Sequence, residues 1–558
     1  MSQTRKRLTV AIIGGTGVFG ARLARLLARD GHRLIVAARR GGGALAAELG
    51  AESLTLDLRE DLTPLFAHKP DIVIDAAGPF QTYGESGQPD STALLRAAIA
   101  AGAHYIDLSD APEHCARVTA LDAEARAAGI VALTGVSTVP ALSAAAVHEL
   151  KRGLDQIDRI ESAILPGNRA PRGKAVMQAI LAQIGRPLRI RRGGAWWPSR
   201  GWSEPKVYDL PGGLKRRAYL IGAPDHELFG AHFGAQSVEF RAGLELGIMG
   251  WGLDALSRLR ALYDFPIPLA PVSFGAWALA PFGTDRGGMV VAVTGRVGQG
   301  WERRSWRLVA RSGHGPSVPA IAGRVLVDKM HDLAPGARAA LDELSLADAE
   351  AGMADLDISF TRDSFAVTPL FEAALGEDFS TLAPAVRDSH AWVDAKRFAG
   401  RARVTRGQGL YQNLIARLFG FPPAAEDVPV EVLKLRRGDG EIWHRRIGDA
   451  RFRSVLRLDR GKMTERFGPF TFTIGLTVED GNLHYPVIGG RLGPVPLPRF
   501  LWPRSEAVET AGEEDRFRFD VALYAPLTGQ FIVRYEGDLS PVSAEDGGAS
   551  TLGVAKAS

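Results

Sequence analysis

Residues 8–20 carry the sequence LTVAIIGGTGVFG, an apolar run that ends in a cluster of glycines. The apolar run has the pattern of a strand buried on both faces. Gly15, Gly17 and Gly20 have the spacing G-x-G-x-x-G, and a helix is expected over residues 18–29. Such glycines allow a tight turn, close approach of the backbone to a diphosphate, and close packing of helix on strand. This stretch therefore predicts a dinucleotide-binding turn at the start of a parallel sheet.

The pattern continues through the first 150 residues, where strands and helices alternate. Such alternation is typical of a doubly wound parallel sheet, the Rossmann type of α/β fold, whose ligands lie at the carboxyl ends of the strands. We therefore predict an NADP-binding Rossmann domain over residues 1–150. The expected strands are 8–13, 33–38, 53–57, 71–76, 104–108 and 130–133, and the expected helices are 18–29, 91–101 and 113–128.

The pattern changes twice further along the chain. Residues 151–355 mix strands and helices and predict an α+β domain for substrate binding and dimerisation, closed by helices over 319–332 and 335–344. Residues 356–541 are rich in turns and predict a mostly antiparallel β domain, with a hairpin at Asp480-Gly481-Asn482. Residues 542–558 are small and polar and are predicted to be disordered.

The end of the second expected strand indicates which cofactor binds. A site for NAD usually has an acidic residue there, but this strand ends in Arg39 and Arg40. Two guanidinium groups favour a 2′-phosphate, so NADP is preferred over NAD; the alternative is that both arginines are merely solvated. The predicted cofactor-binding residues also include the segment after the fourth strand. They are Gly14, Gly15, Thr16, Gly17, Val18, Phe19, Gly20, Arg39, Arg40, Ala77, Gly78, Pro79 and Phe80.

Several motifs beyond the glycine turn resemble the saccharopine dehydrogenase-like family of NAD(P)-binding oxidoreductases. They are AAGPF at 76–80, AGAHYIDLSD at 101–110 and GVSTVPALS at 135–143, and the resemblance covers residues 8–350. It implies an NAD(P)-dependent oxidoreductase that transfers hydride to or from a small molecule; saccharopine itself is not implied as the substrate. Further motifs are WHR at 443–445, ERFGP at 465–469 and RYEGDL at 534–539. With them, residues 370–540 resemble an uncharacterised bacterial domain fused behind such oxidoreductases, from which no activity can be carried over.

The sequence does not single out a catalytic pair. No tyrosine has a lysine four residues on, which separates the chain from classical short-chain dehydrogenases. Weak candidates near the expected cleft are Tyr83, Tyr105, Asp107 and Ser109. The alternatives are that the tyrosines pack in the core and that Asp107 caps the following helix.

Two further polar groups have competing interpretations. Arg169, Arg172 and Lys174 precede an expected helix and either hold an anion or form a solvated loop. In the third domain, a polar pocket competes with a structural Glu–Arg network formed by Trp443, Arg445, Glu465, Arg466, Arg499 and Arg534.

Charge and cysteine content indicate which kinds of partner and site are not expected. The net charge of +4 is too small and diffuse to indicate nucleic-acid binding, and the single cysteine, Cys115, precludes an intrachain disulfide and fits the cytoplasm. No metal is expected, because Asp225, His226, Glu227 and His232 are interpreted as isolated exposed polar residues.

Residues 265–284 form the longest uncharged stretch, and the apolar segment 244–262 lies just before it. Four prolines argue against a membrane span, so the region 244–284 is predicted to be buried or to lie in a homodimer interface, with contact to a membrane surface as the alternative. The rivals to a cytoplasmic, NADP-dependent oxidoreductase with an apolar substrate are a non-catalytic NADP-binding redox sensor and a membrane-surface, lipid-modifying reductase.

Overall fold

The structure is a computed structural model that describes residues 6–171, 173–263 and 265–542. Residues 543–558, nearly all of the tail predicted to be disordered, lie outside the described part. The chain divides into two compact units, treated separately below. The first contains residues 1–190, 199–293 and 304–364, and the second contains residues 191–198, 294–303 and 365–558. The domain boundaries predicted near residues 150 and 355 stay predictions.

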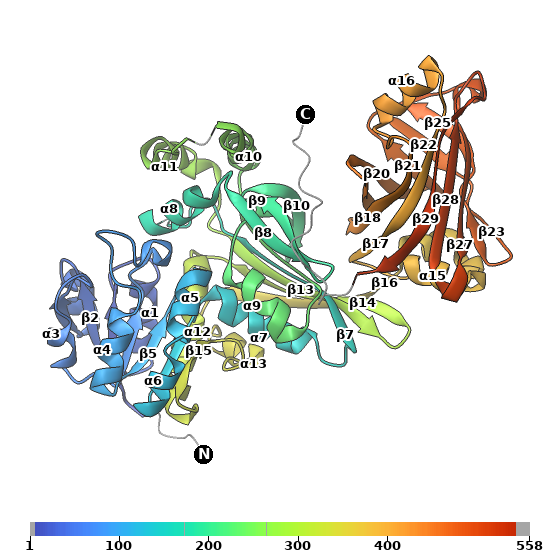
Figure 1. Ribbon diagram of the computed structural model, residues 1–558. Helices are drawn as coiled ribbons and strands as arrows, with labels where there is room; N and C mark the ends of the chain where they lie inside the picture. Colours follow the sequence, from blue (N-terminus) through green and yellow to red (C-terminus); the bar gives the residue numbers. More distant parts are fainter. Residues whose placement is uncertain (1–5, 172, 264, 543–558) are drawn as a thin grey trace. The chain divides into compact units, whose positions relative to one another are not determined.

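The first unit contains a seven-stranded parallel sheet (Figure 1). Its strand order is β15-β6-β5-β4-β1-β2-β3, so the chain reverses direction across the sheet between β1 and β4. This confirms the predicted doubly wound sheet. The strands are β1 (Thr9–Ile13), β2 (Arg33–Ala38), β3 (Glu52–Thr55), β4 (Ile72–Asp75), β5 (His104–Asp107), β6 (Val131–Thr134) and β15 (Gly336–Ala339).

Helices cover both faces of this sheet because alternate residues of each buried strand face opposite sides. One core joins Val10 and Ile12 to α1, α2 and α12, and the other joins Ala11 and Ile13 to α4, α5 and α6. The helices are α1 (Gly20–Arg29), α2 (Gly43–Leu49), α3 (Thr63–Phe66), α4 (Ala93–Ala101), α5 (Pro112–Thr119), α6 (Asp122–Ala127), α7 (Ser143–Leu150), α12 (Val318–Lys329) and α13 (Leu346–Ala351).

Strand β15 corrects one prediction. The helix expected over residues 335–344 is absent, and Gly336–Ala339 instead pairs in parallel with β6. Ala337 is buried, and its N–H donates to the Asp122 carboxylate at 2.9 Å. A free edge of the sheet thus overrides the helical preference of this alanine-rich segment. The helix expected over 113–128 is likewise two helices, α5 and α6.

A second sheet of nine strands is built mostly from residues of the first unit. Its main order is β10-β11-β12-β7-β13-β14-β16, with β8 beside β12 and β9 beside β8. The strands are β7 (Gln156–Leu165), β8 (Pro187–Arg192), β9 (Ala195–Arg200), β10 (Ser203–Leu210), β11 (Leu214–Leu220), β12 (Ser237–Leu244), β13 (Gly287–Val297), β14 (Gly300–Ala310) and β16 (Ile358–Val367). The helices are α8 (Lys174–Gln183), α9 (Pro224–Phe233), α10 (Gly247–Tyr263) and α11 (Leu269–Ala278).

Helices α10 and α11 are exposed, so of the predicted alternatives for residues 244–284 burial in the core is wrong, whereas the homodimer interface and the membrane contact stay predictions. Trp251 is 60% exposed and Trp277 is 72% exposed, and α11 has no buried residue. Of the described residues in the two helices, Leu253, Leu269 and Val272 pack against the apolar cluster around Trp202 and Tyr219. Among the described residues, no helix is both long enough and apolar enough to cross a bilayer.

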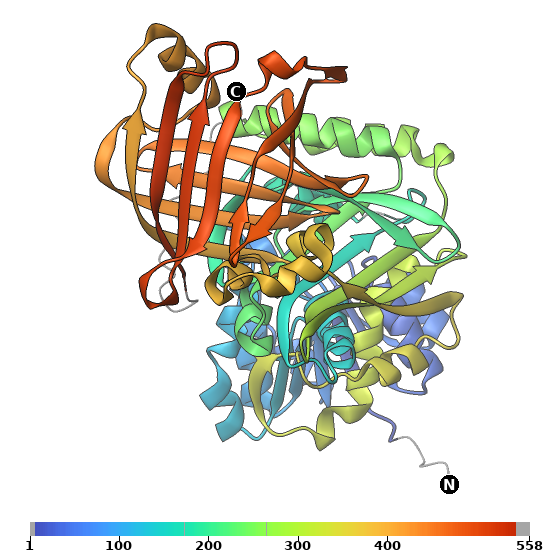
Figure 2. The ribbon, with the colours of Figure 1, turned by 90° about the vertical axis from the view of Figure 1, so that its right-hand side faces the viewer.

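The second unit is built around a thirteen-stranded sheet in which every pairing is antiparallel (Figure 2). Its order is β23-β24-β27-β28-β29-β17-β18-β19-β20-β21-β22-β25-β26. The sheet curves strongly, so one core joins Phe472 of β22 to Phe519 of β28. The predicted hairpin at Asp480 and Gly481 joins β23 to β24.

The strands of the second unit are β17 (Ala395–Arg406), β18 (Ala425–Arg437), β19 (Gly440–Ile447), β20 (Ala450–Asp459), β21 (Lys462–Phe467), β22 (Phe470–Ile474), β23 (Thr477–Glu479), β24 (Asn482–His484), β25 (Val487–Leu492), β26 (Val495–Pro496), β27 (Arg504–Ala511), β28 (Phe517–Tyr524) and β29 (Phe531–Pro541). Its helices are α14 (Leu370–Leu375), α15 (Pro384–His390) and α16 (Leu410–Phe419).

Candidate cofactor-binding cleft

The glycine turn connects β1 to α1 at the point where the sheet reverses direction. Gly14 has a φ of +73°, and a Cβ on it would lie 2.5 Å from the Cα of Ala77. A Cβ on Gly15 would lie 2.8 Å from a methyl group of Val36. The turn is therefore packed between the ends of β2 and β4, with room for glycine alone at these two positions.

Four amide groups of this turn are available for an anion. The N–H groups of Gly14 and Gly15 donate to the carbonyl oxygen of Ala37, and that of Gly17 donates to Gly14. Within the described part of the chain, no acceptor bonds the N–H groups of the remaining turn residues, Thr16, Val18, Phe19 and Gly20. These groups precede or begin α1, whose N-terminus carries a partial positive charge. The arrangement suits a diphosphate.

Arg39 and Arg40 follow β2 directly and are exposed. Neither guanidinium group forms a hydrogen bond or ion pair with a described residue. One acidic group, Asp57, interacts with Arg39: its pKa is lowered to about 2, chiefly by Arg59, with a smaller effect from Arg39. Because Arg59 neutralises Asp57, both arginines keep their positive charge available to a phosphate.

The segment after β4 forms the opposite wall of the turn. The N–H of Ala76 donates to Ile13 at 2.8 Å, which holds residues 76–80 beside β1. Ala77 is half-buried and its N–H donates to the Asp75 carboxylate, while Phe80 is buried and lies 5.2 Å from the ring of Tyr83. The structure thus places the predicted residues 76–80 beside the glycine turn.

Asp107 lies at the end of β5 and is completely buried. Its carboxylate accepts hydrogen bonds from the backbone of Ser109 and Gly135 and from the hydroxyl group of Thr134, and it pairs with His114 at 3.3 Å. Burial alone would lower the pKa of His114, but the Asp107 carboxylate outweighs burial and raises that pKa. Asp107 therefore ties the ends of β5 and β6 together and does not cap α5, which has no side-chain cap.

The other catalytic candidates also lie below the surface. Tyr83 is 5% exposed and its hydroxyl group lies 3.4 Å from Asp75, and Tyr105 is 1% exposed. Burial raises the pKa of Asp75 to about 6. Ser109 is buried, and its hydroxyl oxygen accepts a hydrogen bond from the N–H of Ala111. The sequence interpretation missed Asp75 and His114; a polar residue ending a buried strand was the available signal for Asp75.

A loop from the second sheet meets the glycine turn. Gly173 packs on Val18: a Cβ on Gly173 would lie 3.2 Å from a methyl group of Val18. Earlier in the loop, Asn168 donates to Glu245 and to the carbonyl oxygen of Leu279, which fixes the loop against the segment after α11. Of the predicted anion-binding trio, Arg169 donates to Pro281, whereas Arg172 and the side chain of Lys174 lie outside the described residues.

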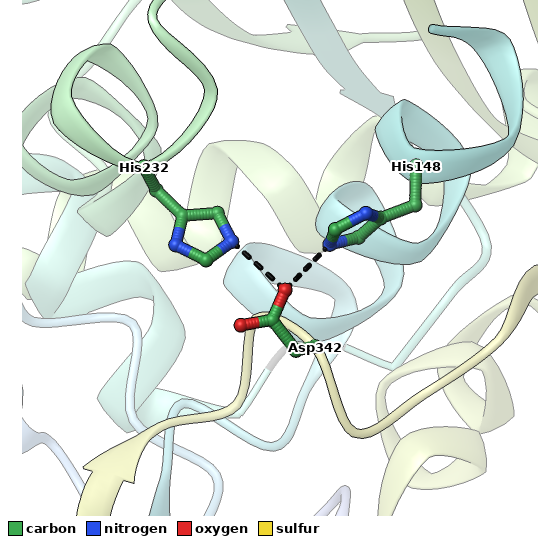
Figure 3. A group of neighbouring side chains, drawn as sticks. All are labelled: His148, His232 and Asp342. Atoms are coloured by element: carbon green, nitrogen blue, oxygen red, sulfur yellow. Dashed lines mark hydrogen bonds and ion pairs between the residues drawn. The ribbon is translucent and has the colours of Figure 1, made fainter. Parts of the chain in front are cut away.

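A separate polar group joins three segments of the first unit (Figure 3). His148 of α7 and His232 of α9 both lie against one oxygen of Asp342, at 2.8 and 2.9 Å. Their ligand atoms are close enough to hold a metal ion, but the contacts are equally those of a hydrogen-bonded trio. The predicted exposure of Asp225 and His226 is wrong, because both side chains are buried. Asp225 accepts a hydrogen bond from the hydroxyl group of Ser162, and His226 accepts one from the N–H of Phe240.

Comparisons with known proteins identify two parts of the chain. Residues 10–133 match the family described as "Saccharopine dehydrogenase NADP binding domain", and residues 382–539 match "Domain of unknown function (DUF4166)". No curated protein matches the chain.

Solved structures resemble the chain weakly. A UDP-glucose-4-epimerase from Stenotrophomonas maltophila is 21% identical over 18% of this chain and 36% of its own, with a TM-score of 0.17. Biliverdin reductase from Synechocystis sp. PCC 6803 is 12% identical over 62% of this chain and 96% of its own (TM-score 0.29). The WlbA dehydrogenase from Thermus thermophilus is 13% identical over 62% of this chain and 92% of its own, with a TM-score of 0.27.

The chain thus spans about a third of the epimerase, and at these TM-scores no property of the three proteins transfers to it. The two family matches are more specific, and the first agrees with the geometry of the glycine turn. The chain carries a saccharopine dehydrogenase-type NADP-binding domain over residues 10–133 and a DUF4166 domain over residues 382–539.

Proposed function

We propose that the chain is an NADP-dependent oxidoreductase acting on a small, largely apolar molecule. The observation that carries this proposal is that, among the described residues, four amide groups of the glycine turn and the two guanidinium groups after β2 have no hydrogen-bond partner. The first feature suits a diphosphate and the second a 2′-phosphate. An acidic residue, which would bond an unphosphorylated ribose, is absent from the end of β2.

In this proposal Gly14 to Gly20 hold the diphosphate, Arg39 and Arg40 hold the 2′-phosphate, and Ala77 to Phe80 direct the nicotinamide end. When bound, NADPH supplies a hydride for an electrophilic carbon of the substrate, which also takes up one proton. Hydride transfer depends mainly on orientation and exclusion of water, and the loop at Asn168 and Gly173 is placed to provide both.

The four catalytic candidates have different proposed roles. Asp107 and Ser109 bond backbone groups, so we assign them to positioning the ends of β5 and β6. Tyr83 and Tyr105 remain candidate proton donors, and Tyr83 is the better placed because its hydroxyl group is already bonded to a second titratable group, Asp75.

The proposal is tested by screening the full chain for NADPH consumption with carbonyl, imine and enoyl compounds, after binding of NADPH has been measured by protein fluorescence. Turnover with any one class supports an oxidoreductase. Tight NADPH binding with no turnover in any class favours a non-catalytic redox sensor instead.

A second candidate is a reductase that works at a membrane surface. The observation that favours it is the exposed apolar set on α10, α11 and the following turn, which includes Trp251, Trp277 and Phe282. Sedimentation with liposomes would reveal this contact, and the change Trp251→Glu should reduce it. Phe365→Glu, at an exposed apolar position of the second unit, is the control.

The same helices offer the proposed homodimer contact, and light scattering of Trp251→Glu separates self-association from membrane binding. The proposed location is the cytoplasm, with peripheral membrane association in the second candidate.

A further inference from the structure

The curved sheet of the second unit lines a partly open cavity of about 140 Å³. Its lining comes from strands at both ends of the sheet path, β19 to β22 on one side and β27 to β29 on the other. A cavity of this size is comparable with an engineered one of about 150 Å³ that binds benzene. The cavity lies within the DUF4166 domain and is distinct from the glycine turn.

Most of the cavity wall is apolar. Phe467 and Phe472 contribute from β21 and β22, and Val521 and Ile532 contribute from β28 and β29. Along these strands alternate residues face opposite sides, so Phe467 faces the cavity whereas its neighbour Arg466 is exposed. Such a wall favours an aromatic or aliphatic group by burial of apolar surface.

One end of the cavity is polar and rich in acceptors. Glu509 is 7% exposed and bonds the imidazole Nε2 of His390 at 2.6 Å, and the same Nε2 lies 3.2 Å from the hydroxyl group of Tyr485. Burial lowers the pKa of His390 to about 4, so the ring is neutral at pH 7 and its Nε2–H donates to Glu509. The oxygens of Glu509 and Tyr485 therefore face the cavity with spare lone pairs.

The cationic group at this end is already engaged. Arg445 donates to Ser454 at 2.7 Å and to Glu465 at 3.3 Å, and its guanidinium group lies 4.8 Å from the ring centre of Trp443. The lining thus presents two carboxylates, Glu465 and Glu509, and a single guanidinium group that is paired with one of them. This balance favours a ligand that donates a hydrogen bond and disfavours a carboxylate or phosphate.

We propose that this cavity binds a small, uncharged molecule with an aromatic or aliphatic body and a hydroxyl group. The body lies against Phe467, Phe472 and Val521, and the hydroxyl group donates its single hydrogen to the oxygen of Tyr485, whose own hydroxyl hydrogen is donated to Glu509. The DUF4166 domain is therefore a binding module for an apolar alcohol, independent of the NADP site.

Fluorine NMR on the full chain tests the proposal with two probes that share a ring, 4-fluorobenzyl alcohol and 4-fluorobenzoate. The alcohol should show saturable line broadening, with a dissociation constant at least tenfold below that of the benzoate. Equal binding of the two probes, or no saturable broadening by the alcohol, would overturn the proposal without requiring any variant.

Variants locate the bound alcohol. Val521→Phe fills the cavity and should abolish saturable broadening, whereas Val495→Phe makes the same change at a position that is 62% exposed and should leave it intact. Tyr485→Phe preserves the volume and should weaken alcohol binding about three- to tenfold, because one hydrogen bond is lost. If Tyr485→Phe and Val521→Phe, both with wild-type melting temperatures, bind the alcohol as the wild type does, the site is wrong.

The two proposed sites can be distinguished in these samples. NADPH affinity should not change in Val521→Phe or Tyr485→Phe, since neither residue belongs to the unit that contains the glycine turn. If the wild-type chain does not bind NADPH, the proposed oxidoreductase activity is contradicted. The binding of the fluorinated alcohol to the cavity is then still a valid test of the cavity proposal.

Discussion

Gly20 lies against Gly14: a Cβ placed on Gly20 would be 2.4 Å from the carbonyl oxygen of Gly14. The first turn of α1 therefore packs directly on the end of β1, and that contact holds the amide groups of Thr16, Val18 and Phe19 together above it. No side chain fits between the two backbones without moving one of them.

Gly20→Ala should therefore impair both folding and cofactor binding. We expect a loss of about 1–3 kcal/mol in the free energy of unfolding, from overpacking, and at least tenfold weaker NADPH binding. Gly252→Ala is the control, because Gly252 lies in a helix with nothing within 4 Å of the added methyl group. That change should leave NADPH binding unaltered and stabilise the helix by up to about 1 kcal/mol. The same NADPH affinity in both variants would contradict the packing argument.

Arg39→Asp should discriminate between the two cofactors. It removes a charge-assisted contact to the 2′-phosphate, worth about 1.5–3 kcal/mol, and adds repulsion. NADPH affinity should fall at least tenfold while NADH affinity changes little, as measured by fluorescence titration. Arg152→Asp is the control, because it makes the same charge change just after α7, at a side chain that is 75% exposed. It should change the affinity for neither NADPH nor NADH. Equal losses for NADPH and NADH in Arg39→Asp would show that the arginine does not contact the 2′-phosphate.

Asp107→Asn should destabilise the first unit strongly. The variant leaves His114 without its buried carboxylate and disturbs three hydrogen bonds, which predicts a loss of about 3–5 kcal/mol in urea unfolding. Asp209→Asn, at an exposed pair with Lys215, should cost under about 1 kcal/mol. A loss for Asp107→Asn as small as for Asp209→Asn, with abolished turnover, would make Asp107 a catalytic group and not a structural one.

The stability of the second unit should depend on pH through His390. Its pKa in the folded chain, about 4, lies below the ordinary value of 6.5, so the unfolded chain binds a proton that the folded chain excludes. This stability is fully present above pH 6.5 and is lost as the pH falls towards 4, by up to about 3 kcal/mol. Urea unfolding at pH 7.5 and 4.5 measures it, and His390→Gln should show the smaller difference between the two pH values. An equal pH dependence in the variant would assign the effect to other groups.

The sequence sufficed for the parallel sheet and the glycine turn because both depend on local patterns: continuous apolar strands, and glycines at fixed spacing. It failed at β15, where Ala337 pairs with Ala132 of β6, about two hundred residues earlier in the chain. A segment of four residues has too little local preference to indicate such a pairing. For α11 the sequence left a core helix and an interface helix open, and only the exposure of the helix excludes the core.

The cavity of the second unit was anticipated only in part. Trp443, Arg445 and Glu465 were singled out as either a pocket or a network, and the structure joins Arg445 to Glu465 at the cavity wall. The partners that define its polar end, His390, Tyr485 and Glu509, come from segments up to 119 residues apart. Their convergence depends on the curvature of the sheet, which no local pattern reports.

The most direct measurement is a paired titration of the wild-type chain with NADPH and NADH, followed by protein fluorescence at one ionic strength. If the amide groups of the glycine turn and the guanidinium groups of Arg39 and Arg40 hold the cofactor, NADPH should bind at least tenfold more tightly than NADH. Equal affinities, or tighter binding of NADH, would contradict the assignment of these arginines and of the NADP site.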